Sequence, residues 1–112
     1  INELNLNQQY DLIYSTGTIQ YLFDDRIEPF FDHLKEITAV GGYVYFNVFV
    51  DKPFLPLPPD WDKEEKMWKT GQLFTRLADW EIIKMDEIFL DCNSSGIPHV
   101  HCMDTVIAKR RV

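Results

Sequence analysis

The pattern of apolar and polar positions divides the chain into alternating strands and helices. Residues 10–15 (YDLIYS) and 42–50 (GYVYFNVFV) are rich in aromatic and β-branched side chains, and each run predicts a strand buried on both faces. Between them, residues 26–40 carry apolar side chains three or four positions apart, which predicts an amphipathic helix. A strand, a helix and a second strand in this order predict a parallel pair joined by a crossover helix.

The ends of that helix carry recognisable signals. Asp24 or Asp25 is expected to cap its start, and Pro29 is compatible with the first turn. Gly41 and Gly42 are expected to end the helix, because glycine adopts the left-handed conformation found after many helices.

The second half of the chain predicts different elements. Residues 51–63 contain four prolines and predict an irregular loop. We expect a single helical turn at 64–68 and a short helix at 70–78. Residues 80–91 and 99–109 alternate in polarity on either side of a turn, which predicts an antiparallel hairpin. The fold class is therefore α/β, with parallel strands followed by an antiparallel C-terminal hairpin.

Composition narrows the class of protein. Apolar residues make up 46% of the 112 residues and the net charge is −7, which favours a packed domain over a disordered chain. The only basic cluster, at 109–111, is explained by a solvated tail, so we expect no nucleic-acid partner. No apolar run approaches the roughly 20 residues of a membrane-spanning helix, and the first residues do not resemble a secretory signal. We expect a cytoplasmic protein without a membrane partner.

The two cysteines, Cys92 and Cys102, lie on the two strands of the predicted hairpin. They are too few for a disulfide framework and lack the spacing of a redox motif. We interpret them as reduced thiols, which can face each other across the hairpin.

The order and spacing of four segments resemble the C-terminal half of class I S-adenosylmethionine-dependent methyltransferases, and most closely their tellurite-resistance-type branch. The segments are YDLIYSTGTIQYL at 10–22, AVGGYVYFNVFV at 39–50, LFTRLADWEII at 73–83 and DTVIAKR at 104–110. The resemblance implies a partial Rossmann-like sheet over 1–112 as a single partial domain, with S-adenosylmethionine as the cofactor of the intact parent.

Two departures from the family pattern bear on activity. The glycine-rich loop that follows the family's first strand has no counterpart among the five glycines of this chain. The acidic residue that family members place after their second strand is absent too. We therefore expect a fragment that begins at a motif, lacks the cofactor-binding half and is inactive alone.

The best candidates for a cofactor contact are Ser15, Thr16 and Gly17, at the carboxyl end of the first strand. In open α/β sheets, ligands bind at these ends. The resemblance implies that this stretch lies beside the methionine part of the cofactor, and that Ile1 and Asn2 lie near its adenine. The alternative interpretation of Ser15 to Gly17 is a strand-ending turn, because all three are turn residues.

The candidates for acceptor binding are Gln20 and Tyr21, on the loop after the first strand, and His99 and His101 in the hairpin. A histidine in that place can move protons near neutral pH. The alternative for Tyr21 is packing, which we favour. His33 is expected on the surface of the helix.

Asn47 and the proline loop have two interpretations each, and a third feature concerns possible metal ligands. Asn47 interrupts an apolar strand, and its side chain either faces the substrate crevice or bonds to a neighbouring loop. We favour the bond to a neighbouring loop. The apolar residues Phe54, Leu55, Leu57 and Trp61 of the proline loop either cover the acceptor site or pack over the sheet edge. His99 and His101 share one face of their strand and Cys102 and Asp104 the other, so one face offers two ligands, and we expect no metal site.

Two functions follow. In the first, the chain is part of a methyltransferase that acts on a small-molecule or oxyanion acceptor such as a tellurium or selenium oxyanion. In the second, it is a non-catalytic α/β module that assembles into a homo-oligomer. An apolar first strand without a second neighbour would expose backbone groups that pair with another chain.

Overall fold

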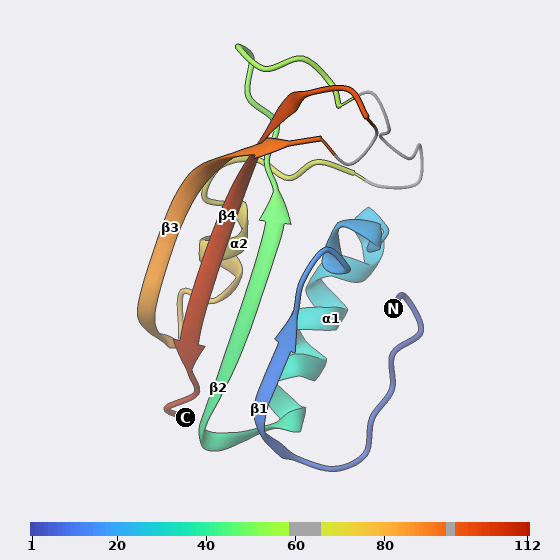
Figure 1. Cartoon of the computed structure of the whole chain (residues 1–112). Coiled ribbons are helices and arrows are strands. Elements are labelled where there is room, and N and C mark those ends of the chain that lie inside the picture. The colour runs from blue at the N-terminus through green and yellow to red at the C-terminus, as the bar shows by residue number, and fades with distance from the viewer. Residues whose placement is uncertain (59–65, 94–95) are drawn as a thin grey trace.

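The computed structural model describes residues 1–58, 66–93 and 96–112, and Figure 1 shows their arrangement. The elements in chain order are β1 (Tyr10–Ser15), the 3₁₀ helix η1 (Ile19–Tyr21), α1 (Asp24–Ile37), β2 (Thr38–Phe49), α2 (Gln72–Arg76), β3 (Glu81–Cys92) and β4 (His99–Lys109).

The four strands form one sheet in the order β1-β2-β4-β3. β1 and β2 are parallel, whereas β4 is antiparallel to both of its neighbours. The α/β class, the parallel pair and the antiparallel C-terminal hairpin are therefore confirmed. The hairpin inserts its second strand between β2 and β3, so β1 and β3 are the two edges of the sheet.

One hydrophobic core lies between the sheet and both α-helices. Every second residue of β2, from Val44 through Phe46 to Val48, is buried on this side. The ring of Phe46 meets that of Phe30 of α1 edge-on, with centroids 6.1 Å apart. The core also contains Ile19, Leu22, Ile27, Phe31, Leu34, Val50, Trp68, Leu73, Leu77, Trp80, Cys102, Val106 and Ala108.

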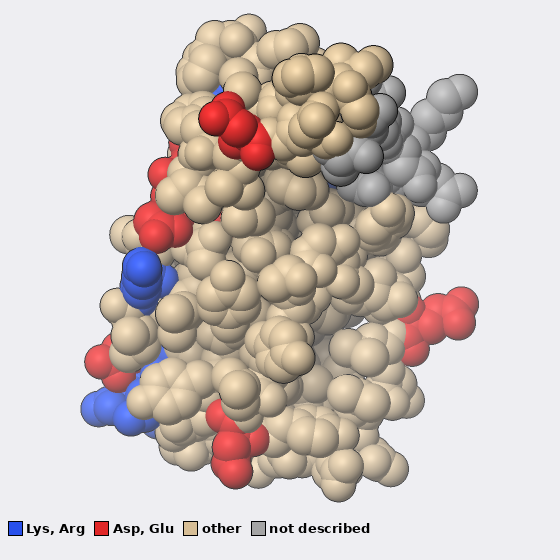
Figure 2. Space-filling view, in the orientation of Figure 1, with Lys and Arg blue, Asp and Glu red and all other residues tan. Residues whose placement is uncertain are grey.

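The other side of the sheet is open, and the prediction that the first two strands are buried on both faces is wrong. In β1, Leu12 is 60% exposed and Tyr14 is 71% exposed, and Tyr43 of β2 lies beside Leu12. Figure 1 is drawn from this side, with α1 and α2 behind the sheet. The middle of the face is uncharged in Figure 2, and charged side chains gather along its left margin over β3. Both α-helices of the described chain pack on one face, which leaves the second face to solvent.

The helix α1 ends earlier than its glycines predict. Its last residue is Ile37, and the Thr38 hydroxyl donates a hydrogen bond to the Leu34 carbonyl at 2.7 Å. Gly41 and Gly42 lie inside β2 instead, where the pairing with β1 shifts register.

The two glycines allow this irregularity in the strand. Gly41 has a positive φ of 87°, and a Cβ on Gly42 would lie only 2.8 Å from the Ala39 carbonyl oxygen. The expected cap at the helix start is also wrong. Phe23 is the N-cap residue, while Asp24 and Asp25 lie in the first turn. There their negative charges interact favourably with the positive end of the helix dipole.

The segment before β3 is less helical than expected. Of the predicted turn at 64–68, positions 64 and 65 lie outside the described residues, and Trp68 forms a parallel bridge with Val50. The helix expected at 70–78 is shortened to α2, which follows Gly71 at a positive φ of 82°. No helix formed by the described residues is both long and apolar enough to cross a membrane.

Candidate functional site

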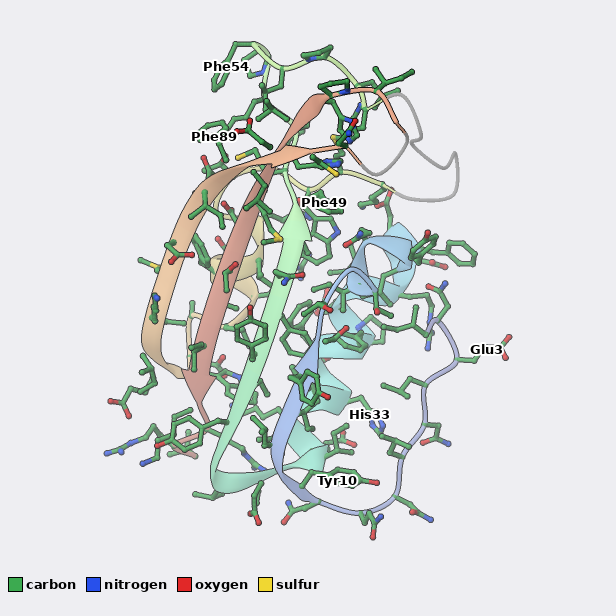
Figure 3. All side chains as sticks on the ribbon, in the orientation of Figure 1. Glu3, Tyr10, His33, Phe49, Phe54 and Phe89 are labelled. Carbon is green, nitrogen blue, oxygen red and sulfur yellow. The ribbon has the colours of Figure 1, made fainter. Side chains whose placement is uncertain are left out.

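The carboxyl ends of the parallel strands β1 and β2 bring most of the predicted site residues to one end of the sheet. Because β4 is antiparallel to β2, it begins at this end, and β3 finishes there. Figure 3 marks the place by Phe49, the last residue of β2. The loop that follows β1 and the proline-rich loop that follows β2 leave from the same end.

The loop after β1 is held by Asn47. The Asn47 side-chain oxygen accepts a hydrogen bond from the Gly17 backbone N–H at 3.1 Å, and the residue is only 6% exposed. Gly17 has a positive φ of 66°, which turns the chain away from the strand. The structure thus confirms the loop-bonding interpretation of Asn47. Beside it, Ser15 is half-buried and Thr16 is exposed.

Asn2 forms hydrogen bonds with residues 21 and 23, which follow the same loop. Its amide group donates to the Tyr21 carbonyl at 3.0 Å and accepts from the Phe23 N–H at 2.7 Å. Its own carbonyl accepts from the Arg26 side chain at 3.1 Å. The structure therefore brings Asn2 and Tyr21 together, and gives Asn2 a positioning role.

An apolar groove of about 360 Å³ runs along the open edge of β1. Ile1 and Ser15, two of the residues predicted to contact the cofactor, both line it. Its other lining residues are Leu4, Leu6, Tyr10, Leu12, Ile13, Tyr14, Phe30, Leu34, Ile37 and Phe46. Residues from the start of the chain, β1, α1 and β2 thus enclose one surface beside the predicted cofactor loop.

Gln20 is more enclosed than an acceptor-binding role suggests. Only 2% of the residue is exposed, and its side-chain oxygen has no hydrogen-bond partner among the described residues. Its backbone carbonyl accepts from the Lys66 N–H at 3.0 Å, which joins the loop after β1 to the segment before α2.

His99 and His101 lie together, as their shared strand face predicts. Their Nε2 atoms are 2.9 Å apart, and the His101 ring stacks on Phe49 with centroids 4.6 Å apart. Register places Cys92 of β3 opposite His99 and Phe89 opposite Cys102. The expected approach of Cys92 to Cys102 is therefore wrong, because the hairpin pairs each cysteine with another residue. Neither cysteine forms a disulfide with a described residue.

His33, expected on the surface, is half-buried. Its Nε2 accepts a hydrogen bond from the Leu6 N–H at 3.0 Å, so it fixes the first segment of the chain against α1.

The described part of the proline-rich loop covers a small cavity of about 60 Å³ at the end of β2. Leu55 and Leu57 line the cavity from the loop, and His101 and Cys102 line it from β4. Phe54 points outward and meets Phe89 of β3, with ring centroids 5.9 Å apart (Figure 3). Of the apolar loop residues singled out from sequence, Trp61 lies outside the described residues.

Beneath this loop lies a polar cluster that the sequence interpretation missed. The Lys52 ammonium is 2.6 Å from a Glu87 carboxylate oxygen, and the Thr70 hydroxyl donates to the other at 2.9 Å. Asp104 is fully buried beside Glu87 and accepts the Gly71 N–H at 3.0 Å. The signal was the alternation of β4, which places Asp104 between two buried apolar neighbours on the covered face.

The two carboxyl groups of the cluster have opposite preferences for a proton. Burial, and then the neighbouring Glu87, raise the pKa of Asp104 to about 7. The hydrogen bond from Asp104, and then Lys52, lower the pKa of Glu87 to about 2. A protonated Asp104 can donate to an ionised Glu87, which satisfies a buried Asp104 oxygen that otherwise has no partner in the described structure. Asp104 therefore holds a proton, and the ionised Glu87 pairs with the Lys52 ammonium.

Cys102 lies next to this cluster, and its thiol is unreactive near neutral pH. Burial, followed by the Glu87 charge, raises the pKa of its thiol to about 11. Since the thiolate is the reactive form of cysteine, Cys102 is a packing residue near neutral pH.

The chain is similar to proteins of known class. The family model described as tellurite resistance protein TehB matches residues 1–94. A probable S-adenosyl-L-methionine-dependent methyltransferase TehB from Haemophilus influenzae is 30% identical over 89 residues, which make up 78% of this chain and 29% of that protein.

The fold is shared with solved structures of methyltransferases, among them the following two. The crystal structure of TehB from Haemophilus influenzae matches with a TM-score of 0.81 at 23% identity, over 98% of this chain and 38% of that one. The N-methyltransferase NodS from Bradyrhizobium japonicum, solved with S-adenosyl-L-homocysteine, matches with a TM-score of 0.67 at 12% identity, over 97% of this chain and 50% of that one. The chain thus spans half or less of each relative, and its sheet is part of a class I methyltransferase fold.

Proposed function

Because the chain belongs to the tellurite resistance protein TehB family, we propose that it supplies the C-terminal part of an S-adenosylmethionine-dependent methyltransferase. The resemblance inferred from the sequence is confirmed at the level of the family. The acceptor class we propose is a small molecule or an oxyanion. On its own, the 112-residue chain is proposed to be inactive.

The observation that carries the proposal is the groove along β1. Ile1 and Ser15 lie far apart in the sequence but line the same apolar surface, beside the loop that Asn47 holds through Gly17. Ligands of open α/β sheets bind at the carboxyl ends of the strands, which is where this loop lies. We assign Ile1, Asn2, Ser15, Thr16 and Gly17 to the cofactor side.

The acceptor side is proposed to lie across the same end of the sheet, toward the hairpin. We assign Tyr21, His99 and His101 to this side, and we propose that the buried Gln20 supports the loop from within. Catalysis in such a site relies on positioning the acceptor nucleophile in line with the transferred methyl group. The loop over the end of β2 supports this placement, because Leu55 and Leu57 add apolar side chains to the lining of the cavity beside His101.

A second function, a non-catalytic module that assembles into a homo-oligomer, is favoured by the open side of the sheet. β1 is an edge strand, and Leu12 and Tyr14 expose apolar surface next to its unpaired backbone groups. Two cysteines are too few for a disulfide framework, and on that ground we propose the cytoplasm for either function.

Titration of the isotope-labelled 112-residue chain with S-adenosylhomocysteine tests the first function, with the mass in solution measured alongside. Weak binding with backbone shifts at Ile1, Ser15, Thr16 and Gly17 is the expected result. Ser15→Lys places charge in the groove and should remove those shifts. Ile83→Lys, on the exposed opposite edge of the sheet, is the matched control and should keep them.

Shifts that are absent, or that appear only outside the groove, would contradict the cofactor assignment. Tight binding, at micromolar concentration, would contradict the proposal that the 112-residue chain is inactive on its own. An oligomeric mass without cofactor contact would favour the second function.

A further inference from the structure

Three potential metal ligands meet where β3 ends and β4 begins. The sulfur of Cys92 and the ring nitrogens of His99 and His101 provide ligand atoms that all lie within 4.8 Å of one another. One face of β4 alone offers only two possible ligands, His99 and His101. The third ligand comes from the neighbouring strand, because the hairpin register sets Cys92 opposite His99.

The spacing of the ligand atoms is close to that of a tetrahedral zinc site. Zn–S and Zn–N bonds of roughly 2.3 and 2.0 Å place ligand atoms on one ion about 3–4 Å apart. The Nε2 atoms of His99 and His101 are already 2.9 Å apart, with the ring planes nearly perpendicular. A small rotation of the half-buried Cys92 side chain would complete the set.

Contacts around the histidines orient them for this task. His99 Nδ1 lies 2.7 Å from the Ile97 carbonyl oxygen, which accepts a hydrogen bond from the Nδ1–H and leaves Nε2 of that ring as the ligand atom. The His101 ring is held against Phe49 by a stacked contact, with an interplanar angle of 25°. A carbonyl on the second nitrogen of a histidine is the usual outer contact of metal-binding imidazoles.

The cluster is also accessible from solvent. An open hollow of about 410 Å³ is lined by Cys92 and His99, together with Asp91, Asn93, Pro98 and Val100. It offers an entry path, and three protein ligands leave a fourth position for water or a ligand.

We propose that Cys92, His99 and His101 form a binding site for a borderline-soft divalent cation, with Zn²⁺ as the best match. One thiolate and two imidazoles suit zinc and copper rather than magnesium or calcium, which prefer oxygen ligands. The inference goes beyond the proposed methyltransferase function and does not depend on it. Binding at this place would fix the hairpin end beside Phe49, next to the proposed acceptor region.

Titration of the metal-free, reduced chain with Co²⁺ tests the site, because a cobalt thiolate gives a charge-transfer absorption that imidazole ligands do not. We expect one Co²⁺ per chain with that band, and its loss when Zn²⁺ is added. Cys92→Ser should abolish the band, and His99→Gln or His101→Gln should weaken Zn²⁺ binding by at least about tenfold. Cys102→Ser is the matched control, since it removes the other thiol and should keep both band and affinity.

A second measurement needs no variant. Zn²⁺ should protect Cys92 from alkylation in the native chain, as read by mass spectrometry of the peptides. Cobalt binding without the charge-transfer band, a band that survives Cys92→Ser or disappears in Cys102→Ser, or alkylation of Cys92 at the same rate with and without Zn²⁺, would each overturn the proposal.

Discussion

The two faces of the sheet differ in what covers them, although the same strands supply both. On the covered face, Val44, Phe46 and Val48 of β2 pack against the helices and are almost completely buried. On the open face, Leu12 and Tyr14 of β1 and Tyr43 of β2 are apolar or aromatic and yet exposed. Successive residues of a strand point to opposite faces, so the contrast arises between neighbours in the sequence.

The comparison shows that side-chain type and burial are separate properties. Parallel strands in α/β proteins are usually covered on both faces, and the composition of β1 fits that environment. In the described structure, α1 and α2 lie on the same side, so the apolar side chains of the open face are available to another part of a larger protein or to a second chain.

The largest expected effect comes from truncating the covered face. Phe46→Ala removes a side chain that is 1% exposed and meets the rings of Phe30 and Phe31. We expect a loss of about 3–5 kcal/mol of unfolding free energy in urea, because the cavity cannot close fully. Tyr14→Ala, on the open face, should change stability by less than about 0.5 kcal/mol. A comparable loss for Tyr14→Ala would show that the open face is buried in solution.

A medium effect is expected from the polar cluster on the covered face. The pKa of Asp104 rises from 3.8 to about 7 in the folded state, so the native protein binds this proton more tightly than the unfolded chain does. Stability from Asp104 is therefore complete below pH 3.8 and is lost as the pH rises to about 7. Glu87 has the opposite dependence, because its pKa falls from 4.5 to about 2 in the folded state. Its contribution to stability therefore grows as the pH rises from about 2 and is complete above about pH 4.5.

We expect the unfolding free energy of the native chain to fall by on the order of 2 kcal/mol between pH 4.5 and 7. Asp104→Asn should remove this slope, because an amide can donate to Glu87 and still accept from Gly71. Asp86→Asn, one position before Glu87 on the opposite face of β3, is the control and should retain the slope. A pH-independent native stability would contradict the shared-proton arrangement.

The smallest effect is expected from Asn47 on the open face, whose side chain bonds to the predicted cofactor loop. Asn47→Ala deprives the Gly17 N–H of its acceptor and should cost about 1 kcal/mol. Hydrogen exchange at the Gly17 amide should accelerate, as measured by NMR. Thr105→Ala alters the residue paired with Asn47 on β4 and should leave that exchange rate unchanged. Equal exchange in all three proteins would mean that Asn47 does not hold the loop.

Local pattern was sufficient where one element decides its own form. The strands at 10–15 and 99–109 were predicted with their observed bounds, because apolar alternation and β-branched content are local properties. The end of α1 was wrong, since Gly41 and Gly42 carry the signal of a helix end but serve a register shift between β1 and β2. The need for glycine there arises from a neighbouring strand, which the local sequence does not reveal.

By itself, the sequence determined the class of fold, the order of its elements, the family resemblance and the residues at the carboxyl end of β1. Only the tertiary structure decided which residues from different strands meet. Hairpin register joined Cys92 to His99 and separated it from Cys102, and the covering loop joined Lys52 to Glu87. The helices decided which face of the sheet became the core. These outcomes depend on contacts between distant segments, whereas the periodicity of a single segment records only which of its side chains favour burial.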